Sequence, residues 1–185
     1  SLPFLKDNEL NEAREINERV SAALKNEYNE GYKGILYGGF MATRNGVKLI
    51  EYNARFGDPE AMNLLTLIDT DFASICMSIA NGNLVDVKFK SQASVCKYVV
   101  PKGYGSNPAK DATLIVDDSY KEHSDLYYAA VNVNDLGDIT TTSSRAAAIV
   151  STGDDIKTAE SRCEAGLSHI SGNNIFVRHD IAKPH

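Results

Sequence analysis

The chain has 185 residues, of which 43% are hydrophobic and 24% charged, a composition ordinary for a globular protein with one core or two small ones. Its formal net charge of -6 argues against non-specific binding to nucleic acid, which needs a basic surface. No apolar run approaches the roughly 20 residues of a membrane-spanning helix, and the N-terminus lacks a signal-peptide pattern. We therefore expect neither a nucleic-acid nor a membrane partner.

The first predicted elements are a helix and a hairpin. Residues 8–28 read as a helix because apolar residues recur at three- and four-residue steps along one stripe: Leu10, Ala13, Ile16, Val20 and Leu24. Gly31 is expected to end this helix. Two strands follow at 33–43 and 47–53, and the residues between them carry a hairpin signal.

The register of this hairpin decides which residue faces Glu51. A two-residue turn at Asn45-Gly46 would place Phe40 opposite Glu51. A three-residue loop with a left-handed Gly46 would place Gly39 there instead. The sequence leaves both registers open.

The second strand ends in a group of polar residues. Glu51 and Asn53 are two residues apart, so on a strand both side chains point to one face. A carboxylate and an amide oxygen side by side are ligands that Mg²⁺ accepts when it also bridges phosphates. Arg55 is expected to continue the alternation, and its planar guanidinium suits a pair of phosphate or carboxylate oxygens. An isolated pair of this kind is usually two solvated residues, but here a helix start follows at once.

That helix start adds an anion site to the prediction. Gly57 gives the backbone freedom, Asp58 is the expected N-cap, and Pro59 is the expected first helical residue. The N–H groups and positive dipole end of the helix would lie beside the metal ligands. For Asp58 a purely structural capping role competes with substrate binding. Glu60 would pair with an amine or favour the first helical turn.

The rest of the chain is predicted to change from helical to mostly β. Helices are expected at 60–68 and 71–80, and one more at 155–171. Strands are expected at 94–100, 113–116, 126–133, 139–142, 146–150 and 175–178. We therefore predict an α+β fold with two domains: residues 1–90, with antiparallel strands and helices, and residues 91–185, small and mostly antiparallel β with one helix.

Three cysteines, an odd number at wide spacings, lie in apolar or helical stretches: Cys76, Cys96 and Cys163. Buried, reduced thiols are typical of a cytoplasmic protein, so we predict a cytoplasmic location. A metal site or a catalytic thiol is the minor alternative.

Taken together, these motifs resemble the phosphoribosylamine–glycine ligase family of the ATP-grasp superfamily. Other ATP-grasp enzymes share the Glu-x-Asn-x-Arg core, and its continuation from Phe56 to Glu60 points to this ligase. The resemblance runs from about residue 6 to residue 181 and includes further segments: 34–43, 46–50, 97–105, 141–145 and 178–181.

The resemblance implies an activity in purine biosynthesis. The intact enzyme would use ATP to phosphorylate the carboxylate of glycine, giving glycyl phosphate and ADP. The amine of 5-phosphoribosylamine would then attack the activated carbonyl and release phosphate. Glu51 and Asn53 would hold Mg²⁺ or Mn²⁺ on the ATP phosphates, and Arg55 would act as the catalytic residue that stabilises charge on the transferred group.

The resemblance also implies a substrate site, and it raises the question of a missing third metal ligand. The substrate-binding residues would be Gly57, Asp58, Pro59, Glu60 and Arg145. A structural salt bridge is an equal expectation for Arg145. Many ATP-grasp enzymes carry a third metal ligand opposite the strand glutamate, and relatives of this ligase can have Gln there. If Gly39 takes that place, water would substitute for the ligand or one ion would bind weakly.

Length suggests that part of the site lies elsewhere. The family enzyme is much longer, and this sequence has no glycine-rich phosphate loop and no N-terminal βαβ series. The resemblance implies that residues 1–90 are the C-terminal part of an ATP-grasp domain and residues 91–185 the C-terminal domain. We expect a C-terminal fragment that lacks the N-terminal and lid portions of the same enzyme, binds nucleotide weakly and shows no turnover alone. Two alternatives remain open: another ATP-grasp carboxylate–amine ligase, or a non-catalytic module that retains the motif.

Overall fold

A computed structural model describes residues 2, 4–29 and 31–183. It divides into two compact units, Ser1–Asp58 with Thr70–Val87, and Pro59–Asp69 with Lys88–His185. The predicted mixture of helices with antiparallel sheets is confirmed. Among the helices described, none is both long and apolar enough to span a bilayer.

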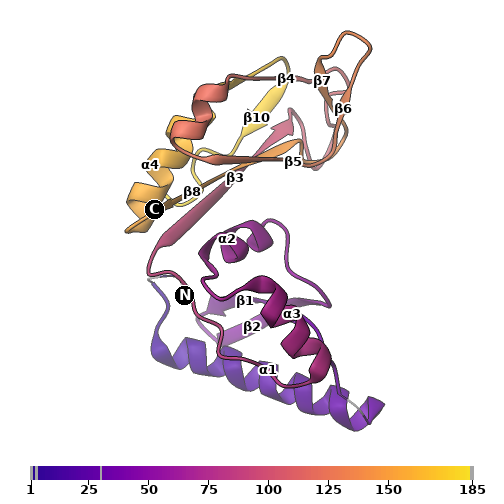
Figure 1. Ribbon diagram of the computed structural model, residues 1–185, viewed down its shortest axis with the longest axis vertical. Coiled ribbons are helices and arrows are strands. Elements are labelled where there is room, and N and C mark those ends of the chain that lie inside the picture. Colours follow the sequence, from indigo (N-terminus) through magenta and orange to yellow (C-terminus); the bar gives the residue numbers. More distant parts are fainter. Residues whose placement is uncertain (1, 3, 30, 184–185) are drawn as a thin grey trace. The chain divides into compact units, whose positions relative to one another are not determined.

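The first unit consists of two helices and a β-hairpin (Figure 1). Its elements are α1 (Asp7–Tyr28), β1 (Tyr37–Thr43), β2 (Gly46–Asn53) and α3 (Phe72–Asn81). The predicted apolar stripe of α1 is half-buried, and α1 packs on the hairpin. Glu12 of α1 accepts a hydrogen bond from the Val47 backbone N–H at 2.8 Å. The Tyr52 hydroxyl donates to Asn17 Oδ1 of the same helix at 2.7 Å, so both strand ends of β2 are tied to α1.

Polar residues cap α1 at its C-terminal end and α3 at its N-terminal end. α1 ends at Tyr28, as predicted, but the residue that caps it is Asn29, with a φ of 60°, and not Gly31. Asparagine tolerates this left-handed conformation better than most residues. The Asp71 carboxylate accepts a hydrogen bond from Ser74 N at 2.7 Å and caps α3. This capping lowers the pKa of Asp71, first through its bonds to Ser74.

The second unit contains two four-stranded antiparallel sheets, in the orders β10-β3-β8-β5 and β6-β7-β4-β9. Its elements in chain order are α2 (Glu60–Leu67), β3 (Ala93–Pro101), β4 (Thr113–Val116), the 3₁₀ helix η1 (Asp118–Glu122), β5 (Asp125–Tyr128), β6 (Val131–Val133), β7 (Ile139–Thr141), β8 (Ala147–Gly153), α4 (Ile156–Leu167), β9 (Ile170–Ser171) and β10 (Ile175–Val177).

Two predicted elements of this unit are corrected by long-range pairing. The single strand predicted at 126–133 is split into β5 and β6, which belong to different sheets. The helix predicted to reach residue 171 ends at Leu167. Beyond it, Ile170 pairs with Val116 of β4 instead of lying on the helix stripe. Pairing with a distant strand overrides the local helical pattern in this segment.

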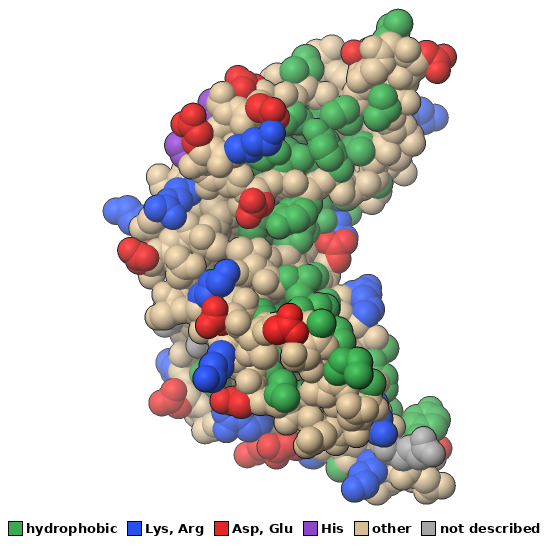
Figure 2. Space-filling model, in the orientation of Figure 1, with side chains coloured by type: hydrophobic (Ala, Val, Ile, Leu, Met, Phe, Trp, Pro, Cys, Tyr) green, Lys and Arg blue, Asp and Glu red, His purple; other side chains and the backbone are tan. Residues whose placement is uncertain are grey.

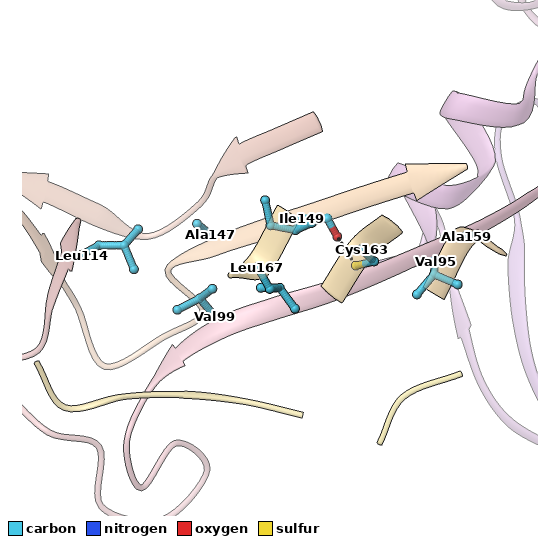
Figure 3. Packing of buried hydrophobic residues seen from close by; sticks show 8 residues of the cluster. All are labelled: Val95, Val99, Leu114, Ala147, Ile149, Ala159, Cys163 and Leu167. Carbon is cyan, nitrogen blue, oxygen red and sulfur yellow. Dashed lines mark hydrogen bonds between the residues drawn. The ribbon is translucent and has the colours of Figure 1, made fainter. Parts of the chain in front are cut away.

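The core of the second unit follows the alternation of β3 and β8. One face of these strands packs against α4, and Figure 3 shows the gathered side chains: Val95, Val99, Leu114, Ala147, Ile149, Ala159, Cys163 and Leu167. The Cys163 thiol lies 3.6 Å from the carbonyl oxygen of Ile149. Cys96, Ala148 and Val150 lie on the opposite face, where Met62 of α2 packs against them. The sheet β10-β3-β8-β5 therefore lies between α4 and α2.

A buried cation interrupts the apolar face of β3. The side chain of Lys97 is 0% exposed, and its Nζ donates to Glu160 Oε1 at 2.8 Å, to Glu164 and to the backbone carbonyl of His179. Burial alone would lower the pKa of Lys97, but the hydrogen bonds that it donates to Glu160 and Glu164, together with their negative charges, outweigh burial and raise that pKa. Burial likewise opposes ionisation of Glu164, yet its bonds to Lys97 and His179 lower its pKa. The cluster is therefore an ion pair in which both signs are charged at neutral pH.

The cysteines are free, as predicted. Cys96 and Cys163 are buried, but Cys76 of α3 is exposed, which corrects the expectation that all are buried. Ile75 is the buried residue next to it in α3 and is 4% exposed. Cys76 follows Ile75 on the helix and therefore points toward the exposed side.

Candidate functional site

The two predicted metal ligands lie side by side at the end of β2. The amide nitrogen of Asn53 donates to Glu51 Oε1 at 2.9 Å, as expected for side chains that share one face of a strand. Glu51 is exposed and Asn53 is half-buried. The pair thus offers a carboxylate and an amide oxygen at an accessible position, both of which are hard ligands suited to Mg²⁺.

A β-bulge sets the register of this pair. The turn contains only Arg44 and Asn45, and Thr43 pairs with Gly46, whose φ is 83°. The register then shifts by one residue, because Phe40 pairs with Leu49 while Gly39 pairs with Glu51. Gly39 is therefore opposite Glu51, as in the second predicted register, but a bulge at Ile50 supplies the shift in place of a three-residue loop.

The bulge also decides which face the ligands occupy. The rings of Phe40 and Tyr52 meet edge to face at 6.4 Å, and Tyr52 bonds to α1, so both side chains lie on the α1 side of the hairpin. Regular alternation from Leu49, the partner of Phe40, would have put Glu51 on that side as well. The extra residue at Ile50 reverses the alternation, so Glu51 points away from α1.

Gly39 leaves room beside the glutamate. A Cβ at this position would lie 3.5 Å from Glu51 Cγ, an ordinary contact distance. A longer side chain would therefore be directed toward Glu51, as the position of a third metal ligand requires. Across the described part of the chain, no group of three or more His, Cys, Asp or Glu residues is arranged to hold a metal ion. Glu51 and Asn53 alone form an incomplete shell, which suits an ion that takes its other ligands from phosphate oxygens and water.

Arg55 is placed by a bend and not by the strand. β2 ends at Asn53, so the expectation that Arg55 continues the alternation was wrong. Its guanidinium Nη1 donates to the backbone carbonyl of Phe56 at 2.7 Å, which fixes the direction of an otherwise exposed side chain.

Tyr32 supports this bend and was missed by the sequence analysis. Its hydroxyl lies 3.0 Å from the carbonyl oxygen of Ala54 and 3.1 Å from that of Ile35, so it links the chain after β2 to the chain before β1. Gly34 is required beside it, because a Cβ there would approach the Tyr32 hydroxyl to 2.7 Å. No sequence signal connects positions 22 residues apart, and the contact follows only from the folded hairpin.

The predicted helix start is displaced by one residue. Pro59 is the N-cap of α2, with φ -92° and ψ -2°, and the helix begins at Glu60. The Met62 N–H donates to the carbonyl of Pro59 at 3.0 Å, so the first helical hydrogen bond starts there. The prediction that Asp58 caps the helix was therefore wrong. Gly57 is buried, and the border between the two compact units falls between Asp58 and Pro59.

Arg145 lies in the second unit, two residues before β8. Its guanidinium carbon is 4.8 Å from the centre of the Tyr98 ring, and the side chain is half-buried. Tyr98 belongs to the face of β3 that Met62 of α2 covers. Glu60 at the start of α2 and Arg145 therefore belong to the same face of this sheet.

Charge on the visible surface is mixed. On the face drawn in Figure 2, Lys and Arg side chains alternate with Asp and Glu and form no continuous basic patch.

Comparisons with known proteins give a consistent result. A family model described as the phosphoribosylglycinamide synthetase ATP-grasp (A) domain matches residues 1–61, and the C domain of the same synthetase matches residues 94–184. The phosphoribosylamine–glycine ligase of Methanocella arvoryzae is 49% identical over 184 residues, which cover 98% of this chain and 42% of that protein. The chain thus spans about two fifths of the length of the curated relatives it matches. The predicted domain border at residue 90 falls between the two matched ranges and remains a prediction.

Solved structures show the same fold at lower identity. The crystal structure of phosphoribosylamine–glycine ligase from Thermotoga maritima superposes with a TM-score of 0.77 at 21% identity, over 95% of this chain and 44% of that one. The biotin carboxylase domain of 2-oxoglutarate carboxylase from Hydrogenobacter thermophilus, in complex with MgADP, ADP and bicarbonate, gives a TM-score of 0.59 at 17% identity. That match covers 83% of this chain and 36% of the other.

Proposed function

Because the chain belongs to the phosphoribosylglycinamide synthetase family, with the ATP-grasp fold, we propose that it supplies part of the active site of an ATP-dependent ligase that joins glycine to 5-phosphoribosylamine. The observation that carries this proposal is the pair Glu51 and Asn53, side by side on the face of β2 that points away from α1. Both the family match and the chemistry of the pair favour a nucleotide-bound divalent cation at this place.

The first step is transfer of the γ-phosphoryl group of ATP to the glycine carboxylate. Glu51 and Asn53 would hold Mg²⁺ or Mn²⁺, which neutralises charge on the β- and γ-phosphates. Asn53 presents its amide NH₂ to Glu51, so its carbonyl oxygen would be the ligand atom. Arg55, anchored at one nitrogen on Phe56, would direct its remaining N–H edge toward the transferred phosphoryl group.

In the second step the amine of 5-phosphoribosylamine attacks the carbonyl of glycyl phosphate and phosphate leaves. Gly57, Asp58, Pro59 and Glu60 are the proposed substrate contacts. Arg145 would bind an anionic group of the substrate. Carboxylates are poor acyl donors, so the phosphate made in the first step serves as the leaving group, and no protein nucleophile is required.

The isolated chain is proposed to bind nucleotide weakly and to have no turnover, because it spans about two fifths of its relatives and has no glycine-rich phosphate loop. The partners would be the N-terminal and lid portions of the same enzyme. We place the protein in the cytoplasm, where free thiols such as Cys76 persist.

The test uses the intact ligase that contains these residues. Glycine- and 5-phosphoribosylamine-dependent ADP formation is measured for the unaltered enzyme and for Glu51→Gln, with Glu18→Gln, an exposed change on α1, as the matched control. We expect a loss of about 10²-fold for Glu51→Gln, the scale for removing a charge-stabilising contact, and no loss for the control. Equal activity of the two variants would refute the metal role. ADP formation that does not depend on glycine would refute the ligase assignment.

A further inference from the structure

We propose that Tyr98 is a positioning residue that holds Arg145 for contact with an anionic substrate group, through the face of its ring. The inference rests on the proposed function, since it assumes that Arg145 binds substrate. It starts from the placement of the guanidinium carbon 4.8 Å from the centre of the Tyr98 ring. This distance is that of a cation–π contact, in which the positive charge is attracted to the face of the ring.

Backbone hydrogen bonds fix the main chain at Arg145 and at the residue that follows it. Its carbonyl accepts a hydrogen bond from Ala130 N at 3.0 Å. The next residue, Ala146, is 0% exposed, and its N–H donates to the carbonyl of Val99 at 2.9 Å. What remains is the orientation of its long side chain, and an arginine side chain carries about 2 kcal/mol of rotamer entropy.

The Tyr98 ring is a rigid support for this side chain. Tyr98 lies in the middle of β3 and pairs with Ala148 of β8. Its ring packs with the buried cluster of Cys96, Ala148 and Val150, which Met62 of α2 also contacts. A ring packed against this cluster keeps one orientation, so it restricts the guanidinium that contacts it.

The contact with the ring is compatible with anion binding. It leaves the guanidinium charged, and phosphate and carboxylate oxygens bind guanidinium N–H groups. α2, which begins with Glu60, lies on the same face of the sheet as Tyr98. The proposed substrate contacts of the second unit thus share one face of β3, and Tyr98 is the residue that joins the arginine to it.

The test compares ring removal with hydroxyl removal in the intact ligase. Tyr98→Leu removes the ring, and Tyr98→Phe keeps it. Met62→Ala is the matched control, because it loosens the same apolar cluster while keeping the Tyr98 ring. We expect Tyr98→Leu to raise the KM of one substrate by about 3- to 30-fold with a smaller change in kcat, the range that a cation–π contact supports. Tyr98→Phe and Met62→Ala are expected to keep the KM of the unaltered enzyme.

A double-variant cycle separates positioning from packing. Arg145→Met should raise the same KM, and adding Tyr98→Leu to it should have no further effect on that KM. Additive effects, or a KM increase in Met62→Ala equal to that in Tyr98→Leu, would overturn the inference. So would a Tyr98→Phe variant as impaired as Tyr98→Leu, since the hydroxyl and not the ring would then hold the arginine.

Failure of the proposed function would look different. An Arg145→Met variant with unchanged kinetics would overturn both the substrate role of Arg145 and the support by Tyr98, while leaving the metal role of Glu51 intact. An unaltered enzyme without glycine-dependent ADP formation would refute the ligase itself, and this is measured before any variant is made.

Discussion

Replacing Lys97 by methionine would remove a buried cation while keeping most of its apolar stem. The change leaves two carboxylates facing each other, Glu160 at 13% and Glu164 at 27% side-chain exposure. Removing one partner of a buried ion pair usually costs about 3–5 kcal/mol. Two contacts soften the loss here, since Lys183 Nζ is 3.7 Å from Glu160 and His179 Nδ1 is 2.8 Å from Glu164. We therefore expect a loss of about 3 kcal/mol in the free energy of unfolding, at the lower end of that range.

Urea unfolding followed by circular dichroism measures this loss. With a denaturant dependence of about 1–3 kcal/mol/M, a loss of about 3 kcal/mol lowers the urea midpoint by about 1 M or more. Lys157→Met is the matched control, because it removes an exposed lysine from the same helix, α4, and should change stability by less than about 0.5 kcal/mol. Equal midpoints for Lys97→Met and Lys157→Met would refute the assignment of Lys97 as a stabilising buried cation.

The pH dependence gives the same prediction an independent check. The lowered pKa of Glu164 contributes stability that is present above the pKa of the unfolded chain and is lost as pH falls through the folded value. The raised pKa of Lys97 contributes stability that is present below its unfolded value and is lost as pH rises through the folded one. The difference between the unaltered protein and Lys97→Met should be largest between about pH 5 and pH 10 and should shrink below about pH 4. A difference that grows in acid would contradict this reasoning.

Three further outcomes follow from local geometry. Deleting Ile50 should remove the bulge and turn the metal-ligand pair toward α1, which should lower the activity of the intact ligase by about 10²-fold. The control Ile50→Val should keep that activity, and equal activities of the two variants would refute the assigned register. Iodoacetamide at pH 8 should modify exposed Cys76 but not Cys163, because burial raises the pKa of Cys163 to about 12. Mass spectrometry of the labelled peptides measures the modification at each cysteine, and equal labelling of both would contradict this prediction. Gly166→Ala should lower the free energy of unfolding by about 1–3 kcal/mol, because the new Cβ would lie 2.9 Å from Ser124 Cβ and still closer to its hydroxyl. Thermal unfolding measures this loss, and an unchanged melting temperature would show that Ser124 can move away.

Features that depend on local patterns were predictable from the sequence. The stripe of α1 follows from its helical period, and the pairing of Glu51 with Asn53 follows from a spacing of two on a strand. The pairing partner of Glu51 was not decided by local pattern. Its register depends on whether an extra residue is inserted into one strand, and no residue type in the hairpin signals a bulge at Ile50.

Features that depend on distant pairing were not predictable. The break between β5 and β6 arises because the two strands join different sheets. Tyr98 and Arg145 are 47 positions apart, and only the pairing of β3 with β8 brings them together. The cap of α2 was misplaced for a more local reason, since an Asp-Pro pair allows either residue to precede the first helical turn.

The order in which the chain visits its two compact units limits how the protein can be divided. The chain crosses from one unit to the other three times, at residues 58/59, 69/70 and 87/88. A single cut between α2 and α3 would leave α3 without the rest of its own unit, and a cut at residue 90 would leave α2 attached to the wrong part. Gene fission and truncation from one end each make a single break, so neither can separate these units cleanly. Any rearrangement that preserves both must carry residues 59–87 together with the chain on both sides.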